Sequence, residues 1–256
     1  MSLLEAPRSV LPEILDHLAP EDPQAQRSRR DLRRVNRFMG ACGILVAGLR
    51  VAALRPSAAT LPRTAALRLL ELGAGDGQLM LRVAQQLTRA GTSQAWRAVE
   101  LQLLDRQSLV SPEILHAYAR LGWRAEPLPC DVRDWAAAPT NGTRYDVIVT
   151  NLFLHHFEPQ ALCALLAAVA ARCERFLACE PRRSVPALLG SHLLAAIGAN
   201  RVTRHDAVLS VRAGFRGSEL SKHWPSGGWQ TEERAAGLFS HYFAAWRTDA
   251  CASGAA

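Results

Sequence analysis

The sequence predicts an α/β fold: a mostly parallel sheet of seven strands, with an antiparallel C-terminal hairpin and an N-terminal helical extension. Three observations lead to this prediction. Apolar residues recur at helical spacing over residues 1 to about 60. From Ala65 onward, short apolar runs alternate with helical segments, the pattern of βαβ units around a parallel sheet. Gly237 separates two strand-like stretches near the C-terminus, which can therefore pair as a hairpin.

The N-terminal extension is predicted to contain a short amphipathic stretch, Ser9–Leu18, and a longer helical segment, Asp22–Leu54. Prolines at 20 and 23 separate the two. Arginines cover much of the longer segment: Arg27, Arg29, Arg30, Arg33, Arg34 and Arg37. Because prolines at 56 and 62 bracket a linker, we expect two domains, residues 1–62 and residues 63–256.

The expected sheet is built from short apolar runs. They are Ala66–Leu72, Ala98–Leu104, Trp123–Pro127, Asp146–Thr150 and Arg175–Cys179, followed by the hairpin strands Gly228–Arg234 and Leu238–Arg247. The expected helices are Asp76–Ala90, a segment from Ser111 to Gly122, Glu158–Arg172, Pro186–Ile197 and Gly217–His223. Ser111, Pro112 and Glu113 suit the cap, the first turn and the positive dipole end of the second of these helices.

The composition fits a globular protein with a substantial core: 256 residues, 49% of them hydrophobic and 21% charged. The formal net charge is +7, and Lys222 is the only lysine, so nearly all the positive charge is arginine. A basic surface is compatible with nucleic-acid binding. A general bias toward Ala, Leu and Arg explains the charge equally well, and we favour it.

Metal binding, secretion and membrane insertion are not predicted. The six cysteines, at 42, 130, 163, 173, 179 and 251, form no C-x-x-C pair and no zinc-finger spacing with histidine. We therefore expect reduced thiols in a cytoplasmic protein. No secretory signal pattern is evident at the N-terminus, and the longest apolar runs fall short of the roughly 20 residues that span a membrane.

The segment from Glu71 to Gly77 carries the strongest functional signal. It reads Glu-Leu-Gly-Ala-Gly-Asp-Gly, directly follows the first predicted strand and opens a helix. Alternating glycines let the backbone turn sharply and approach a ligand closely. Gln78 stands where a dinucleotide-binding G-x-G-x-x-G motif has its third glycine. Asp105 ends the second strand, where a carboxylate can accept hydrogen bonds from both ribose hydroxyls; this supports a nucleoside without identifying it.

The pattern E-x-G-x-G-x-G resembles motif I of class I S-adenosylmethionine (SAM)-dependent methyltransferases, which have a Rossmann-like fold. Asp131 follows the third strand, where this family has an acidic residue facing adenine. The segment Asp146–Phe157 is similar to the fourth-strand region of small-molecule methyltransferases, which often ends in Leu-His-His. The resemblance covers about residues 65–247 and implies SAM as cofactor. It implies these cofactor contacts: Glu71, Gly73, Ala74, Gly75, Gly77, Asp105, Arg106, Asp131, Val132 and Asn151.

Three histidines are candidate general bases. His155 and His156 follow the fourth strand, but one can cap the next helix while the other packs beneath the cofactor. His205 precedes Asp206 in what we expect to be a polar loop, and a carboxylate can orient a histidine. The pair Arg182-Arg183 suits either an acidic substrate or a solvated surface, and we favour the surface.

The resemblance favours a small-molecule acceptor. The Asn-Pro-Pro-Tyr sequence of many enzymes that methylate exocyclic amino groups is replaced by Asn151-Leu-Phe-Leu154. The segments Arg27–Gly40 and Cys179–Arg183 resemble bacterial methyltransferases encoded beside polyketide-type biosynthetic genes. They imply an aromatic polyketide or quinone-like acceptor, secondary metabolism, and an N-terminal helical lid. The alternatives are an RNA or protein methyltransferase, suggested by the charge, and a SAM-binding protein without catalytic activity.

Overall fold

A computed structural model describes residues 7–54, 66–89, 96–140 and 142–248. Their strands are β1 (Leu67–Leu72), β2 (Val99–Asp105), β3 (Trp123–Pro129), β4 (Tyr145–Asn151), β5 (Cys173–Pro181), β6 (Trp229–Ala236) and β7 (Ser240–Arg247). Within the described residues they form one seven-stranded sheet in the order β3-β2-β1-β4-β5-β7-β6. Strands β1 to β5 pair in parallel, and β7 pairs antiparallel with both β5 and β6. The predicted fold class is confirmed.

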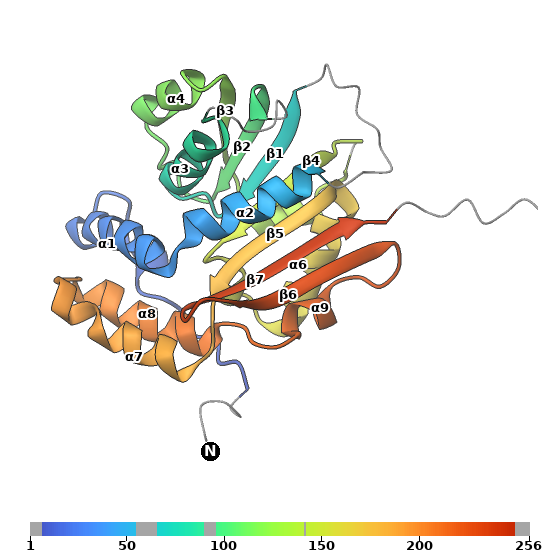
Figure 1. The fold of residues 1–256 in the computed structure, drawn as a ribbon. Helices are drawn as coiled ribbons and strands as arrows, with labels where there is room; N and C mark the ends of the chain where they lie inside the picture. Colours follow the sequence, from blue (N-terminus) through green and yellow to red (C-terminus); the bar gives the residue numbers. More distant parts are fainter. Residues whose placement is uncertain (1–6, 55–65, 90–95, 141, 249–256) are drawn as a thin grey trace, which may run out of the picture.

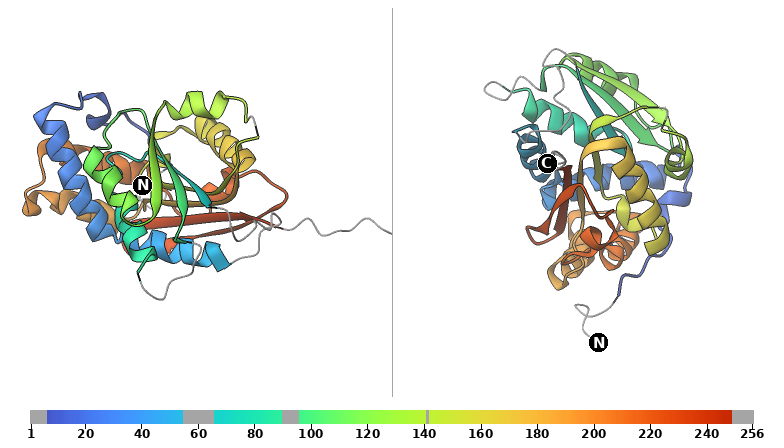
Figure 2. Two further views of the ribbon diagram at one scale, coloured as in Figure 1. Left: turned by 90° about the horizontal axis from the view of Figure 1, so that it is seen from above. Right: turned by 90° about the vertical axis from the view of Figure 1, so that its right-hand side faces the viewer.

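Helices cover both faces of the sheet (Figure 2). One face packs against α2 (Ala41–Leu54), α3 (Gln78–Leu87) and α4 (Pro112–Ala119). The other packs against α5 (Val132–Ala137), α6 (Pro159–Arg172) and α9 (Glu219–His223). Each face has its own apolar cluster, because successive strand residues point to opposite sides: Leu69 belongs to one cluster and Leu70 to the other.

A further group of helices lies beyond the carboxyl ends of β1, β4 and β5 (Figure 1). It comprises α1 (Pro23–Met39), α7 (Val185–Leu193), the short 3-10 helix η4 (Leu194–Ile197) and α8 (Arg201–Ala213). Because ligands of open α/β sheets bind outside the carboxyl ends of the strands, these helices lie where a binding site is expected.

The N-terminal extension differs from its prediction in two respects. The stretch Ser9–Leu18 has no regular secondary structure apart from one 3-10 turn, η1 (Leu15–His17). The segment Asp22–Leu54 forms two helices, α1 and α2, which meet at 60°. Gly40 causes the break, because its φ of +71° lies in the left-handed region that ends a helix. The domain boundary at residue 62 and the linker prolines lie outside the described residues, so the two-domain division stays a prediction.

Two short helices were missed or misassigned. The region of His205 and Asp206 is part of α8, not a loop; Asn200 begins this helix by accepting a hydrogen bond from the Thr203 amide at 2.8 Å. Helix α5 was not predicted, and Asp131 caps it. Ser111 does occupy the cap position of α4, although its hydroxyl makes no cap bond.

Among the described residues, no single helix has the length and apolar character of a membrane span; α1 and α2 meet that criterion only when taken together.

Candidate functional site

The glycine-rich loop between β1 and α3 has the conformation that its sequence predicts. Gly73, Gly75 and Gly77 have φ values of +70°, +56° and +72°, which side-chain-bearing residues rarely adopt. A Cβ at Gly73 would lie 2.4 Å from the Phe153 ring. A Cβ at Gly75 would meet no atom within 4 Å, so the loop is open on that side. The loop therefore offers its backbone to a ligand.

Asp105 braces this loop from the end of β2. One carboxylate oxygen accepts a hydrogen bond from the Gly75 amide at 2.8 Å, and the other accepts one from the Gln107 amide at 2.9 Å. Each oxygen has a second lone pair, so the carboxylate can still accept hydrogen bonds from a ligand. The adjacent Arg106 is exposed and donates to the Asp16 carbonyl at 2.7 Å, which directs it toward the N-terminal segment.

Two buried polar atoms beside the loop have no hydrogen-bond partner among the described residues: Oε2 of Glu71 and Oδ1 of Asn151. Burial, with smaller contributions from Asp76 and Asp105, raises the pKa of Glu71 well above its ordinary value. Unpartnered buried acceptors are rare because they cost free energy. A ligand that brings hydrogen-bond donors, particularly a cationic amino group, would satisfy both atoms.

The remaining predicted cofactor contacts lie at the same edge of the sheet. Asp131 follows β3, and its carboxylate accepts a hydrogen bond from the Arg133 amide at 2.8 Å as the cap of α5. Val132 is buried in the apolar cluster beneath α5 and α6. Ala74 is also buried, within the glycine loop. The structure thus brings these residues together, and their contacts with a cofactor stay a prediction.

Helix α1 covers the loop, and its arginines engage neighbouring loops as well as solvent. Arg33 pairs with Asp76 at 3.3 Å, and Arg29 donates to the Gln107 side chain at 2.9 Å. The Asn151 amide donates to Oδ1 of Asn36 at 3.0 Å. The N-terminal segment therefore contacts the loops that follow β1, β2 and β4.

A buried carboxylate organises the turn after β4. Glu180, on β5, accepts hydrogen bonds from the amides of Phe153, Leu154 and His155, and contacts Nδ1 of His155 at 2.8 Å. At the start of this turn Leu152 has a φ of +51°, which is strained for leucine. Strained backbone is concentrated at functional sites, where the surrounding structure imposes it.

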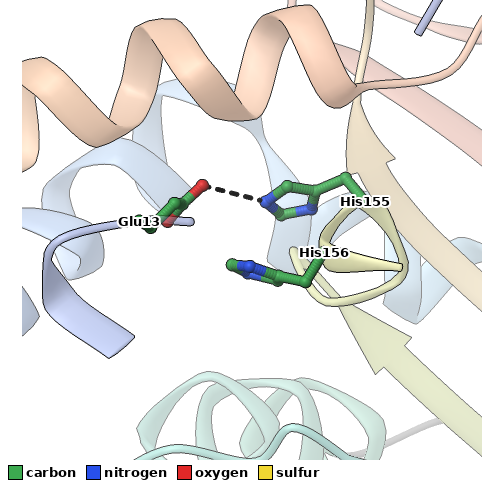
Figure 3. Close-up of side chains that lie close together, drawn as sticks. All are labelled: Glu13, His155 and His156. Atoms are coloured by element: carbon green, nitrogen blue, oxygen red, sulfur yellow. Dashed lines mark ion pairs between the residues drawn. The ribbon is translucent and has the colours of Figure 1, made fainter. Parts of the chain in front are cut away.

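His155 is held between two carboxylates. Glu180 contacts one ring nitrogen, and Glu13 of the N-terminal segment lies 3.5 Å from Nε2 (Figure 3). Burial lowers the pKa of His155, but the two carboxylates outweigh burial and raise it to about 9. His155 is therefore protonated at neutral pH and ties the N-terminal segment to the turn after β4.

The other two histidines have different surroundings. His156 is partly exposed, its ring centroid lies 4.2 Å from that of His155, and its Nδ1 lies 3.3 Å from the Asp16 carboxylate. His205 is 51% exposed and lies 3.0 Å from Asp206. The structure thus places His155 and His156 together and His205 apart from them, on α8.

Glu13, His155 and His156 also form a group with the composition of a metal site. Each offers one potential ligand atom, and these atoms lie within 4.8 Å of one another (Figure 3). Two histidines with one carboxylate can bind a divalent metal. From the sequence we predicted that the protein has no metal site, and this absence stays a prediction.

A cavity of about 290 Å³ lies between α1, α7 and α8 and reaches the end of β4. Its apolar lining includes Leu32, Val35, Phe38, Leu152, Leu193 and Ile197. Glu13 also lines it, so the cavity extends to the ion pair with His155. An apolar cavity beside a cluster of titratable groups is a typical small-molecule site.

Sequence reasoning missed Glu13, Asp16 and Glu180, and it placed Arg183 wrongly. Glu180 carried one signal, because a charged residue directly after an apolar run, here residues 176–179, implies a buried partner. Glu13 and Asp16 carried none, since their partners are far away in the chain. Arg183 is buried, not solvated: it donates to the Gly214 carbonyl and pairs with Glu219, each at 2.5 Å.

No protein-family model and no curated protein sequence matches the chain. Among solved structures, the plantazolicin methyltransferase BpumL in complex with SAH is similar, with a TM-score of 0.59 and 13% identity over 89% of this chain and 92% of that one. BpumL with a monoazolic desmethylPZN analog and SAH gives the same TM-score and identity. The methyltransferase domain of bacterial CtHen1-C has a TM-score of 0.50 and 13% identity, covering 82% of this chain and 98% of that domain. The chain therefore has the fold of these methyltransferases, as the motif resemblance predicted.

Proposed function

We propose that this chain, which has the fold of the methyltransferases compared above, transfers a methyl group from SAM to a small-molecule acceptor. The observation that carries the proposal is the unpartnered carboxylate oxygen of Glu71, buried beside a glycine loop that Asp105 braces. SAM has both features that this arrangement suits: a cationic amino group and a ribose.

The residues at the carboxyl edge of the sheet fit such a cofactor. Glu71 and Asn151 would accept hydrogen bonds from its amino-acid portion, and Asp105 from its ribose hydroxyls. Asp131 and Val132 would lie against the adenine, as the resemblance implies. When bound, SAM supplies an electrophilic methyl group on a sulfonium centre.

The chain itself aligns the reactants and excludes water. Helix α1 closes over the glycine loop through Arg33 and Asn36, and the cavity beneath α1 receives the acceptor. Leu152, which lines the cavity, directly follows Asn151, which we expect to contact the cofactor. An acceptor in the cavity and the cofactor would therefore meet at the end of β4. This alignment is the main contribution, because displacement at a methyl group needs little covalent participation by side chains.

A hydroxyl acceptor must lose a proton, and His156, which is partly exposed beside His155, is our candidate to receive it. Asp16 orients its imidazole, as the third residue of a catalytic triad does. His155 already carries a proton at neutral pH, and His205 is exposed on α8. We assign His156 as general base and His155 as a positioning residue.

Incubation with methyl-labelled SAM and a panel of phenols, quinols and RNA tests the function. We expect label in a phenolic or quinol-like acceptor of the kind predicted for secondary metabolism. His156→Gln should lower kcat by about 10²- to 10⁴-fold with unchanged SAM affinity. The matched control His205→Gln should retain wild-type activity.

Two results would contradict this account. Salt-sensitive labelling of RNA alone would favour the nucleic-acid alternative. SAM binding without transfer to any acceptor in a cell extract would favour a binding protein without catalytic activity.

A further inference from the structure

The cavity between α1 and α7 opens through an apolar mouth. Phe38 and Leu193 line the cavity and are also 65% and 67% exposed to solvent. Ile197 of η4 likewise both lines the cavity and reaches the surface. Side chains that belong to the wall and to the surface mark the place where a ligand can leave the cavity.

An exposed apolar stripe continues from this mouth along α7. It consists of Val185, Leu189 and Leu193 on α7 and of Ile197 on η4, each four residues after the one before. Residues spaced by four lie on one face of an α-helix, so the three side chains on α7 form a track that leads to Ile197 at the mouth. Contiguous exposed apolar surface is unusual on a soluble protein and typically marks a binding site.

The polar side chains that line the cavity already have partners within the protein. The two carboxylate oxygens of Asp206 each accept a hydrogen bond at 3.0 Å, from the amides of Ile14 and Leu15. Ser28 donates to Asn200 at 3.0 Å, and Ser210 donates to Glu13. A polar ligand group in the cavity would lose its water and would have to share partners that already bond within the protein, whereas an apolar group meets a mostly apolar lining. The cavity therefore favours apolar ligands.

The volume limits how much of a ligand fits inside. A cavity of roughly 150 Å³ accommodates benzene, so about 290 Å³ accommodates a small ring system with short substituents. A larger acceptor must extend through the mouth, and the surface that it meets there is the α7 stripe.

We propose that the methyl acceptor is a lipid-tailed molecule: its reactive ring lies in the cavity, and its long alkyl chain leaves between Phe38 and Leu193 to lie along α7. The identity of the ring as methyl acceptor rests on the proposed function, whereas the binding of the tail does not. The chain can come from a dissolved lipophile or from a bilayer lipid, because both present the same alkyl chemistry.

Calorimetric titration of the full chain with 4-alkylphenols from ethyl to decyl, without SAM, tests the tail. We expect affinity to rise about fourfold with each methylene, the equivalent of about 0.8 kcal/mol for each buried CH₂. Leu193→Glu should weaken decylphenol binding at least tenfold and leave ethylphenol binding unchanged. Val51→Glu, at an exposed apolar position on α2, is the matched control and should change neither.

Affinity that does not depend on chain length, or decylphenol binding unaffected by Leu193→Glu, would overturn the proposal. So would a concentration-dependent dimer that Leu193→Glu abolishes without any chain-length effect, since the stripe would then bind a second copy. Flotation with phosphatidylcholine vesicles containing decylphenol distinguishes the two sources of the alkyl chain. A protein that takes its ligand from a bilayer floats with the vesicles, whereas one that binds a dissolved lipophile extracts the phenol into solution. SAM titration of the same samples reports separately on the proposed function.

Discussion

The buried carboxyl of Glu71 lowers the stability of the folded protein, but it would suit a cationic ligand. Burial raises the pKa of this carboxyl, so the folded protein retains a proton that the unfolded chain loses above about pH 4.3. The native state is therefore destabilised as the pH rises from that value through the folded-state pKa. A cationic group bound to Glu71 would reverse this effect.

Glu71→Gln should consequently lower SAM affinity without lowering stability. Loss of a charge-assisted hydrogen bond of about 1.5–3 kcal/mol predicts roughly 10- to 100-fold weaker binding. The unfolding free energy at pH 8 should equal or exceed that of the wild type. Calorimetry and denaturant unfolding measure the two quantities, with Glu100→Gln, at an exposed position on β2, as control. Unchanged SAM affinity would remove Glu71 from the site.

At the scale of elements, α1 is held against each loop that it covers by individual side-chain contacts. The hydrogen bond between Asn36 and Asn151 joins the last turn of α1 to the end of β4. Because this bond holds α1 in place, Asn36→Ala should speed SAM dissociation about 3- to 10-fold, as expected for a net hydrogen-bond contribution of about 1 kcal/mol. Stopped-flow fluorescence measures the rate, and Arg30→Ala, an exposed change on the same helix, should leave it unchanged. Equal rates in both variants would show that α1 is not a lid.

The C-terminal hairpin is joined to α9 by Glu233 of β6. Its carboxylate accepts hydrogen bonds from the amides of Leu220 and Ser221, and contacts His241 of β7 at 2.7 Å. Burial raises the pKa of Glu233, but these hydrogen bonds outweigh burial and lower it. The stabilisation is therefore present above the unfolded-state pKa of about 4.3 and is lost as the pH falls through the folded-state value.

Glu233→Gln should reduce the unfolding free energy at pH 7 by about 2–3 kcal/mol, and the difference should shrink as the pH falls below the unfolded-state pKa of about 4.3. Its neighbour Glu232 is a matched control, because its side chain is 39% exposed, against 3% for Glu233, and pairs with the exposed Arg234. Glu232→Gln should change stability by less than about 0.5 kcal/mol. A pH-independent effect at Glu233 would contradict the charge-based explanation.

At the scale of the whole molecule, the sequence predicted what depends on local chemistry. The glycine loop and Asp105 were predictable because backbone conformation at Gly73 and Gly75 and a carboxylate at a strand end are encoded by neighbouring residues. The grouping of Glu13 with His155 was not, because more than half of the chain separates them. Helix α8 was missed because its polar residues resemble a loop, although Asn200 carried a cap signal.

The fold also gives a structural explanation for part of the positive charge on α1. The arginines of α1 suggested a nucleic-acid surface, but Arg29 and Arg33 make contacts within the protein, beside the glycine loop. Part of the basic character thus joins α1 to loops at the carboxyl edge of the sheet. The same helix lies between the glycine loop, where we propose that the cofactor binds, and the cavity that it shares with α7 and α8.

Calorimetric titration with SAM of the wild type, Asp105→Asn and the exposed-site control Asp134→Ala tests the central claim most directly. Asp105→Asn retains a side-chain oxygen that can accept the hydrogen bond from the Gly75 amide, but its NH2 group replaces the oxygen that accepts from the Gln107 amide. The account predicts SAM binding by the wild type and by Asp134→Ala, and binding at least tenfold weaker in Asp105→Asn. Failure of the folded wild type to bind SAM, or equal binding by all three proteins, would contradict it.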